Sequence, residues 1–162
     1  MKIGIMSDSH DHMTRTRHAV DVMMERQVEA VIHAGDFISP LTFDSMSHLN
    51  VPFYGVFGNN DGEKLFLKKR FAVLGELHER FLIVELGGLK IIATHEDAVA
   101  ESLARSGDYD VVIYGHTHLP DIRTIDKTLL INPGEVCGWL NGRPTIAILD
   151  TETRQTELIP LK

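Results

Sequence analysis

The chain has 162 residues, of which 43% are hydrophobic, and this is enough to bury the core of one domain without disulfides. It carries 16 lysines and arginines against 23 aspartates and glutamates, so its formal net charge at pH 7 is −7. Proteins that mainly grip nucleic-acid backbone present a basic surface, so this acidic balance disfavours a nucleic-acid polymer as the partner and leaves small anionic substrates open.

The first 71 residues alternate between short apolar runs and amphipathic stretches. Short apolar runs predict strands, and apolar residues three or four positions apart predict helices. This pattern predicts strands at residues 2–6, 30–33 and 53–57 and helices at 13–27, 40–49 and 63–71. We expect Ser39 to cap the second of these helices, with Pro40 at its first position. Strands that alternate with helices favour a parallel sheet.

Beyond residue 71 most of the predicted elements are strands. They are predicted at residues 81–86, 89–94, 110–113, 121–125, 128–131, 144–150 and 153–159. Gly87-Gly88 joins the first two in a hairpin, and the last two form another hairpin. Asp97 is expected to cap a helix that reaches Arg105 and stops at Gly107. Parallel units followed by hairpins indicate an α/β fold in which two sheets stack with helices outside.

Polar side chains follow five of the predicted strands at the points where the strands end. They are Asp8 and His10, then Asp36, then Asn59, Asn60 and Asp61, then His95, and finally His116 and His118. Ligands gather outside the carboxyl ends of strands in α/β sheets, so we expect these side chains to meet. Each group alone fits an ordinary turn, but turns have no special use for imidazole, so the set predicts a metal site. An extended backbone would place the rings of His116 and His118 on one side.

The chain resembles the calcineurin-like metallophosphoesterases, whose five-part signature is matched in order by Asp8-Ser9-His10, Gly35-Asp36, Gly58-Asn59-Asn60-Asp61, Thr94-His95 and Gly115-His116-Thr117-His118. The compact spacing and Asn132-Pro133-Gly134 are similar to the small single-domain phosphodiesterase branch of that superfamily. The resemblance implies a four-layer α/β/β/α sandwich of two mixed β-sheets flanked by helices. It also implies a single metallophosphoesterase domain over residues 1–162.

The resemblance further implies a metal-dependent phosphodiesterase, in which a hydroxide held between two divalent cations attacks the phosphorus of a small phosphate ester. Transferred residue by residue, it assigns one cation to Asp8, His10 and His118, the other to Asn59, His95 and His116, and the bridging position to Asp36. Catalytic roles fall to Asp36, Asn59 and Asp61, although turn chemistry explains Asp61 nearly as well. Nitrogen and oxygen ligands without thiolate fit manganese, which we expect first, or nickel, iron, cobalt or zinc.

Two positions depart from the family pattern. Many members have, after the Gly-Asn pair, a histidine thought to protonate the leaving oxygen, and here Asn60 stands in its place. General acid assistance is worth about 10²–10⁴ in rate, so its absence favours leaving groups that depart unaided, or requires a substitute such as His12 or a metal-bound water. Glu96 follows His95 where the family often has glycine, and it is expected either to orient a ring or to repel an anionic substrate.

Two other functions stay open at this point. A retromer subunit of the same fold works mainly by binding partners, so a protein-interaction scaffold is one alternative. Such scaffolds tend to lose metal ligands, whereas the ligand set is complete here. Larger relatives are nucleases, which is the second alternative and is disfavoured by the net charge of −7.

Three residues are expected to be structural. His33 lies within an apolar strand and should be a hydrogen-bonded neighbour instead of a ligand. Trp139, the single tryptophan, lies near a turn, where packing against other residues is the expected role and a lid or stacking residue is the alternative. Cys137 should be a small, partly buried side chain. As the only cysteine, it can form no internal disulfide, so an oxidising compartment is not indicated.

The beginning of the chain predicts no membrane partner. The apolar run after Lys2 is interrupted by Ser7 and Asp8, which makes it too short for a signal-peptide core or a membrane span. We therefore expect a cytoplasmic protein. The residues define neither its physiological substrate nor its oligomeric state.

Overall fold

The computed structural model describes all residues from 1 to 162. Its helices are α1 (Met13–Glu25), α2 (Thr42–Met46), α3 (Lys64–Phe71) and α4 (Asp97–Ser106). Its strands are β1 (Lys2–Met6), β2 (Ala30–His33), β3 (Phe53–Val56), β4 (Gly75–His78), β5 (Phe81–Leu86), β6 (Leu89–Thr94), β7 (Val111–Ile113), β8 (Asp121–Ile125), β9 (Thr128–Asn132), β10 (Thr145–Asp150) and β11 (Thr156–Pro160). None of the helices combines the length and the apolar composition that crossing a bilayer requires.

The first sheet has the strand order β11-β10-β1-β2-β3-β4. Strands β1 to β4 run parallel, because a helix in each connection returns the chain to the same end of the sheet. Strands β10 and β11 are antiparallel to their neighbours. The predicted alternation of strands and helices is therefore confirmed, and the late hairpin extends the same sheet.

The second sheet has the order β5-β6-β7-β9-β8. Its three central strands are parallel, and β5 and β8 pair antiparallel at the two edges. Gly87 and Gly88 both have positive φ, 55° and 79°, which two-residue hairpin turns require. The predicted hairpin of β5 and β6 is thus confirmed, and both sheets are mixed.

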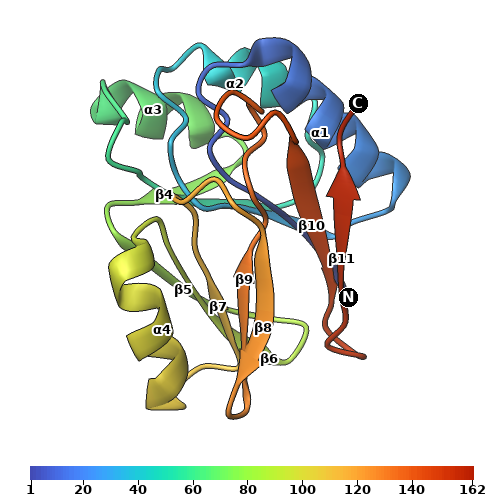
Figure 1. Ribbon diagram of the computed structural model, residues 1–162. Helices are drawn as coiled ribbons and strands as arrows, with labels where there is room; N and C mark the ends of the chain where they lie inside the picture. The colour runs from blue at the N-terminus through green and yellow to red at the C-terminus, as the bar shows by residue number, and fades with distance from the viewer.

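Three apolar layers hold these elements together. The largest lies between the first sheet and helices α1, α2 and α3, and it includes Met23, Met46 and Phe71. A second layer fills the space between the sheets, with Ile5 and Ile113 among its members. A third lies between the second sheet and α4. Figure 1 shows α4 on the side of the molecule away from the other helices, so the predicted four-layer α/β/β/α sandwich is confirmed.

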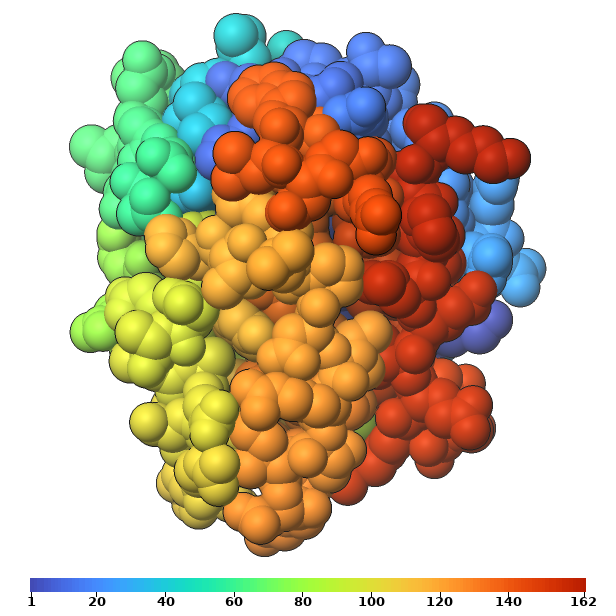
Figure 2. All heavy atoms as spheres, in the orientation of Figure 1, coloured from blue at the N-terminus to red at the C-terminus, as the bar shows by residue number.

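The loop between β9 and β10 is buried at residues 133–137 and reaches the surface at residues 139–143, beside the start of α1. In Figure 2 it is the orange-red segment at the top of the molecule, next to the blue N-terminal segment. Arg15 of α1 donates a hydrogen bond to the carbonyl oxygen of Cys137 in this loop. The loop therefore stands over the end of the molecule where β1 leads into α1.

Strand β4 is absent from the sequence prediction. Gly75, Glu76 and His78 lack the apolar pattern of a strand, and the segment becomes one because its backbone completes the edge of β3. Gly75 is required at this edge, since a Cβ there would lie 1.7 Å from the carbonyl oxygen of Phe53. Tertiary pairing therefore decides the conformation of this segment.

Several element ends also differ from prediction. Helix α2 begins at Thr42 instead of Pro40, because the N–H groups of Thr42 and Phe43 bond to carbonyls three residues back, as in a 3₁₀ turn. Helix α1 ends at Glu25, and the last strand begins at Thr156. Asp97 is the first residue of α4 and not its cap. The predicted stop at Gly107 is confirmed by its left-handed conformation.

Phe71→Ala is expected to lower the free energy of unfolding by about 3–5 kcal/mol. Phe71 is fully buried, and its ring lies 5.2, 5.5 and 5.1 Å from the rings of Phe37, Phe43 and Phe53. Phe66→Ala on the same helix is the matched control, since Phe66 is 61% exposed and its loss should change stability by less than about 0.5 kcal/mol. Denaturant unfolding followed by circular dichroism measures both, and equal losses would contradict this packing.

Candidate metal centre

The polar residues that follow five strands meet at one edge of the sandwich. Asp8 and His10 follow β1, Asp36 follows β2, Asn59 follows β3, His95 follows β6, and His116 and His118 follow β7. Strands β1, β2 and β3 belong to the first sheet, and β6 and β7 belong to the second. The structure therefore brings together, from both sheets, the residues that the sequence singled out as ligands.

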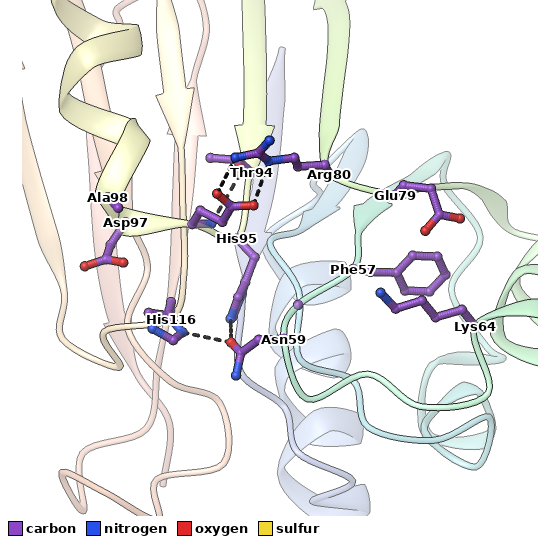
Figure 3. A pocket seen from close by; sticks show the side chains of 12 residues that line it. Phe57, Asn59, Lys64, Glu79, Arg80, Thr94, His95, Asp97, Ala98 and His116 are labelled. Carbon is purple, nitrogen blue, oxygen red and sulfur yellow. Dashed lines mark hydrogen bonds and ion pairs between the residues drawn. The ribbon is translucent and has the colours of Figure 1, made fainter.

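Asn59, His95 and His116 form one ligand group. Oδ1 of Asn59 lies 2.9 Å from both Nε2 of His95 and Nδ1 of His116, and Figure 3 shows the two rings directed at this oxygen. Nε2 of His95 also lies 3.5 Å from Oδ2 of Asp36. Asp36 therefore stands at the border of this group.

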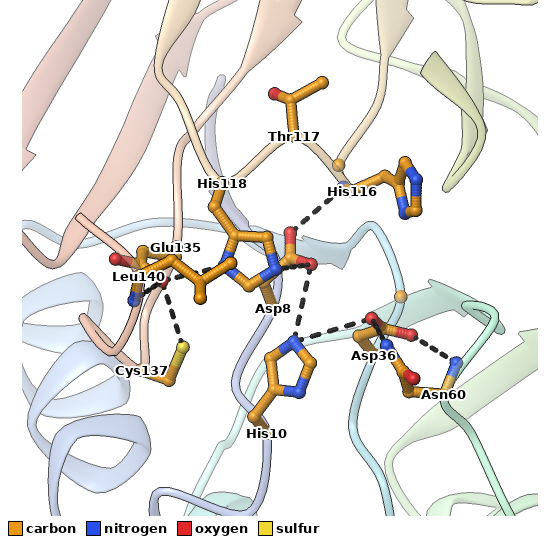
Figure 4. Close-up of polar contacts among 12 residues, drawn as sticks. Asp8, His10, Asp36, Asn60, His116, Thr117, His118, Glu135, Cys137 and Leu140 are labelled. Carbon is orange, nitrogen blue, oxygen red and sulfur yellow. Dashed lines mark hydrogen bonds and ion pairs between the residues drawn. The ribbon is translucent and has the colours of Figure 1, made fainter. Parts of the chain in front are cut away.

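Asp8, His10 and His118 form the other ligand group (Figure 4). Nε2 of His10 lies 3.7 Å from Oδ1 of Asp8, and Nε2 of His118 lies 3.3 Å from the same oxygen. Nε2 of His10 is also 3.5 Å from Oδ2 of Asp36. This Asp36 oxygen is thus equally distant from His10 and from His95, which places Asp36 between the two groups.

Several buried polar atoms of this centre lack a partner. Oδ1 of Asp8 and Nε2 of His10 are buried without a hydrogen bond. Nδ1 of His95 lies 2.8 Å from the carbonyl oxygen of Ala34, which can only accept, so Nδ1 carries a proton and Nε2 is the ring nitrogen that faces Asn59 and Asp36. Lone pairs that face one another repel, and a cation between them removes the repulsion. The donor set of imidazole, carboxylate and amide oxygen therefore fits divalent metal ions.

The buried charges shift the pKa values of the centre. Burial alone raises the pKa of Asp36, but the hydrogen bond and charge of His95, with the donors of Asn60, bring that pKa well below its usual range. Burial lowers the pKa of His10, and the nearby carboxylates of Asp8 and Asp36, 3.7 and 3.5 Å from its Nε2, more than reverse this. The pKa of His95 is likewise lowered by burial and raised overall by Asp36. The centre thus holds an anion and attracts positive charge.

Five of these residues have a left-handed backbone conformation. The φ values are 53° for Asp8, 45° for His10, 61° for Asp36, 69° for His116 and 61° for His118. Non-glycine residues rarely adopt this region, and they persist there only where the surrounding structure enforces it. The expectation that His116 and His118 lie on an extended backbone is wrong. Their left-handed turns send one ring to each ligand group.

Asp61 holds two ligand loops together through their backbones. Its carboxylate accepts N–H groups from Gly58 and Ile38, both at 2.7 Å, and from Asp36 at 3.2 Å. Burial raises the pKa of Asp61 against the opposing effect of these donors. Gly58 must lack a side chain, because a Cβ there would lie 2.0 Å from Oδ1 of Asp36. Asp61 therefore positions Asp36 through the main chain.

Asn60, which replaces the family's histidine, is bound to Asp36. Its backbone N–H donates to Oδ1 of Asp36 at 2.9 Å, and its side-chain amide donates to Oδ2 at 2.7 Å. These two bonds help to keep Asp36 ionised. The residue therefore fixes the central carboxylate.

Glu96 and His12 also have defined contacts. Glu96 forms two hydrogen bonds of 2.7 Å with Arg80, so its charge is paired with a cation. The carboxylate of Glu96 therefore has its hydrogen-bond donors from Arg80 and does not need the ring of His95. His12 is the cap of α1, and its Nδ1 accepts the N–H of Arg15 at 3.4 Å.

Glu135 is a residue of the centre that the sequence prediction missed. Its carboxylate is fully buried, and Oε2 lies 2.7 Å from Nδ1 of His118 (Figure 4). Its other donors are the N–H groups of Leu140 and Asn141, at 3.1 and 2.7 Å, and the thiol of Cys137. Burial raises the pKa of Glu135, and the hydrogen bond from His118 and the N–H donors reverse this, so Glu135 is ionised. It fixes the Nδ1–H tautomer of His118 and leaves Nε2 free to bind a cation.

His33 and Cys137 have the structural roles expected of them. Both are fully buried. Burial raises the pKa of the Cys137 thiol to about 12, so the thiolate that binds metals is not formed at neutral pH. Nε2 of His33 lies 3.0 Å from the hydroxyl of Ser9, and its Nδ1 accepts the N–H of Gly35 at 3.2 Å. Burial, together with the charge of His95, lowers the pKa of His33 to about 3.

A two-sheet sandwich with nitrogen and oxygen ligands at its strand ends is the architecture of a metal-dependent hydrolase. Residues 1–154 match the family model of the calcineurin-like phosphoesterase superfamily domain. The chain therefore belongs to this superfamily of metal-dependent enzymes that hydrolyse phosphate esters.

The relatives found by sequence and by structure agree with this assignment. The chain is 45% identical over 166 residues to phosphodiesterase MJ0936 of Methanocaldococcus jannaschii, with 100% of both chains covered. The solved structure of an archaeal phosphodiesterase matches with a TM-score of 0.94 at 44% identity, covering 99% of this chain and 100% of that one. A Vps29 variant from Entamoeba histolytica matches with a TM-score of 0.73 at 17% identity, covering 100% of both chains, which shows a shared fold alone.

Glu135→Gln is expected to weaken manganese binding by about 10–100-fold, because a neutral amide accepts Nδ1–H of His118 less strongly and can turn its NH₂ toward the ring instead. Isothermal titration of the EDTA-treated protein with Mn²⁺ measures this without reference to activity. Glu152→Gln is the control, since the Glu152 side chain is 84% exposed and pairs with the N-terminal ammonium group instead of with a proposed metal ligand. Equal affinities for Mn²⁺ in the Glu135 variant and the wild type would contradict the role given to Glu135.

His33 is expected to make the metal-free protein less stable in acid. Its folded-state pKa of about 3 lies below its ordinary value of 6.5, so its contribution is complete above pH 6.5 and is lost as the pH falls toward 3. The stability difference between wild type and His33→Gln should therefore shrink by up to about 1.4 kcal/mol per pH unit below 6.5. Subtracting the variant cancels the opposite contributions of His10 and His95.

Urea unfolding of EDTA-treated wild type and His33→Gln between pH 8 and pH 4.5 measures this difference. Two curves that stay parallel across the range would show that His33 is not held neutral by its burial.

Proposed function

We propose that the protein is a metal-dependent phosphodiesterase that hydrolyses a small phosphate ester with two divalent cations, of which manganese is the first candidate. The observation that carries this proposal is Asp36, whose Oδ2 lies 3.5 Å from a histidine of each ligand group. A carboxylate shared between two sets of ligands is what a two-metal site requires. The name of the 45% identical relative, a phosphodiesterase, supports a diester as the substrate.

The ligand groups would divide between the cations as the family pattern implies. Asp8, His10 and His118 would hold one, Asn59, His95 and His116 would hold the other, and Asp36 would serve both. When bound, the cations supply a water of lowered pKa as the nucleophile and positive charge against the negative charge that develops at phosphorus.

The protein's own residues keep this centre in one arrangement. Asn60 and Asp61 hold Asp36 by its side chain and by its backbone N–H. Glu135 keeps the ring of His118 in one tautomer. Preorganised groups of this kind do not have to reorient when charge develops, and this is a main source of rate enhancement. Asn59 takes part through the oxygen that both neighbouring histidines face.

The kind of leaving group that suits this site can be inferred from Asn60. An amide has no proton of suitable pKa to give, and the amide of Asn60 is already bonded to Asp36. We therefore propose diesters whose leaving groups depart without an acid. His12 is the candidate acid for poorer leaving groups, since its ring lies 5.8 Å from that of Trp139, which is in turn 6.1 Å from that of His10.

A cavity of about 470 Å³ opens beside the group of Asn59, His95 and His116 (Figure 3). Its volume is in the range of small-molecule sites, which are about 300–1,000 Å³. Lys64 lines it, with Nζ 5.3 Å from the centre of the Phe57 ring. We propose that this cavity receives one organic group of the ester.

The proposal includes a small substrate and a cytoplasmic location. The net charge of −7 opposes the binding of long anionic polymers, so a nuclease is less well supported than a small-ester hydrolase. The complete ligand set is better explained by turnover than by a scaffold role. Cys137, buried and without a second cysteine to pair with, is in keeping with a reducing compartment.

Asp36→Asn is expected to reduce manganese-dependent hydrolysis of bis(p-nitrophenyl) phosphate by at least about 10²–10³-fold, because it removes the shared charge at the centre. Asp126→Asn is the matched control: Asp126 has a φ of 53°, close to the 61° of Asp36, and asparagine tolerates this conformation. Release of p-nitrophenolate measures the rate, and circular dichroism checks the fold. Full activity in the Asp36 variant would refute the proposed function.

A further inference from the structure

Trp139 is exposed to solvent, so the expectation that it packs against other residues is wrong, and the alternative of a lid or stacking residue stays open. Its exposed fraction is 62%, and it is the only tryptophan in the chain. Single exposed apolar residues are common on protein surfaces, so exposure alone assigns no role. A role for Trp139 is indicated by the position of its ring beside His10 and by the hydrogen bonds that hold its loop.

The indole lies at the rim of the ligand group of Asp8, His10 and His118. Its ring centre is 6.1 Å from that of His10 and 5.8 Å from that of His12, at interplanar angles of 42° and 38°. The His10 ring is itself 5.1 Å from the ring of His118. A large aromatic surface therefore stands next to a proposed metal ligand, and most of it is uncovered.

Hydrogen bonds before Trp139 tie its loop to the metal centre. The N–H of Val136 donates to the carbonyl oxygen of Ser7 at 3.0 Å, and the N–H of Cys137 donates to that of Asp8 at 3.1 Å. Asp8 is one of the proposed ligands. The segment that leads to Trp139 is thus fixed against the end of β1.

Hydrogen bonds after Trp139 tie the loop to the centre a second time. Leu140 and Asn141 donate their N–H groups to the carboxylate of Glu135. The side-chain amide of Asn141 donates to the carbonyl oxygen of His118 at 3.0 Å. The backbone that carries the indole is therefore held in place relative to His118 before any ligand arrives, which lowers the entropic cost of binding against it.

We infer that Trp139 stacks against a planar aromatic group of the phosphate ester, with a nucleobase as the representative case. The inference rests on the proposed phosphodiesterase function. A phosphate bound to the proposed cations would lie near His10, so an indole 6.1 Å from that ring would stand where an ester substituent extends. Stacking accepts any base, since every base has a π face. The site would therefore select aromatic over aliphatic esters without selecting one base.

Adenosine 5′-monophosphate and ribose 5-phosphate test this inference, because they share the sugar and the phosphate and differ by the base. With the manganese-loaded protein, the adenosine compound should inhibit hydrolysis of bis(p-nitrophenyl) phosphate about 5- to 150-fold more tightly. Trp139→Ala should abolish this preference by weakening the adenosine compound alone. Trp139→Phe should retain most of it, and Leu140→Ala, which shortens the exposed neighbour, should retain all of it.

Fluorescence supplies a readout that does not depend on catalysis. Trp139 is the only tryptophan, so its emission should be quenched saturably by adenosine 5′-monophosphate and not by ribose 5-phosphate. Such quenching in a protein that hydrolyses no ester would support stacking while the proposed function fails.

Two outcomes would overturn the inference and leave the hydrolase standing. One is a Trp139→Ala enzyme that still prefers the adenosine compound. The other is an equal loss of preference in Leu140→Ala, which would assign the effect to the loop as a whole instead of to the indole.

Discussion

The centre is organised by one electrostatic constraint, which is that buried carboxylate and amide oxygens and imidazole nitrogens from both sheets face one another at the strand ends. In the group of Asp8 and His10, His118 comes from the opposite sheet, and in the other group Asn59 faces two histidines of the opposite sheet. A cation in either group would be held by both sheets. Cation binding and the stacking of the sheets would then stabilise each other at this edge, since binding to the folded state alone adds to folding free energy.

The same constraint explains the backbone of the ligand loops. A left-handed non-glycine residue is strained by about 1–3 kcal/mol, and such residues persist only where other contacts enforce them. Here the N–H groups of Asp8 and His10 bond to carbonyls of the β2 loop at 3.0 Å, and the N–H of His116 bonds to Oδ2 of Asp8 at 3.2 Å. Because these contacts join distant parts of the chain, the ring directions of His116 and His118 could not be predicted from their spacing.

Some features of the fold and of the centre could be predicted from local sequence patterns, and others depend on contacts between distant residues. Strand and helix alternation and the Gly87-Gly88 turn are local patterns, so the layers followed from them. Strand β4 depends on pairing with β3, which local pattern does not contain. The ligand types stood out because turns seldom need imidazole. Glu135 had a weaker signal, a carboxylate next to the apolar Val136, and only its burial against His118 gives it a role.

Glu135 also links the proposed metal ligand His118 to the loop that carries Trp139. One of its oxygens accepts Nδ1–H of His118, and its carboxylate accepts the backbone of the loop that carries Trp139. A cation at Nε2 of His118 makes Nδ1–H a stronger donor and so strengthens the buried anchor of that loop. Coupling of this kind is reciprocal. If a cation at His118 favours the binding of a ring against Trp139 through this anchor, that ring would favour cation binding at His118 by the same factor.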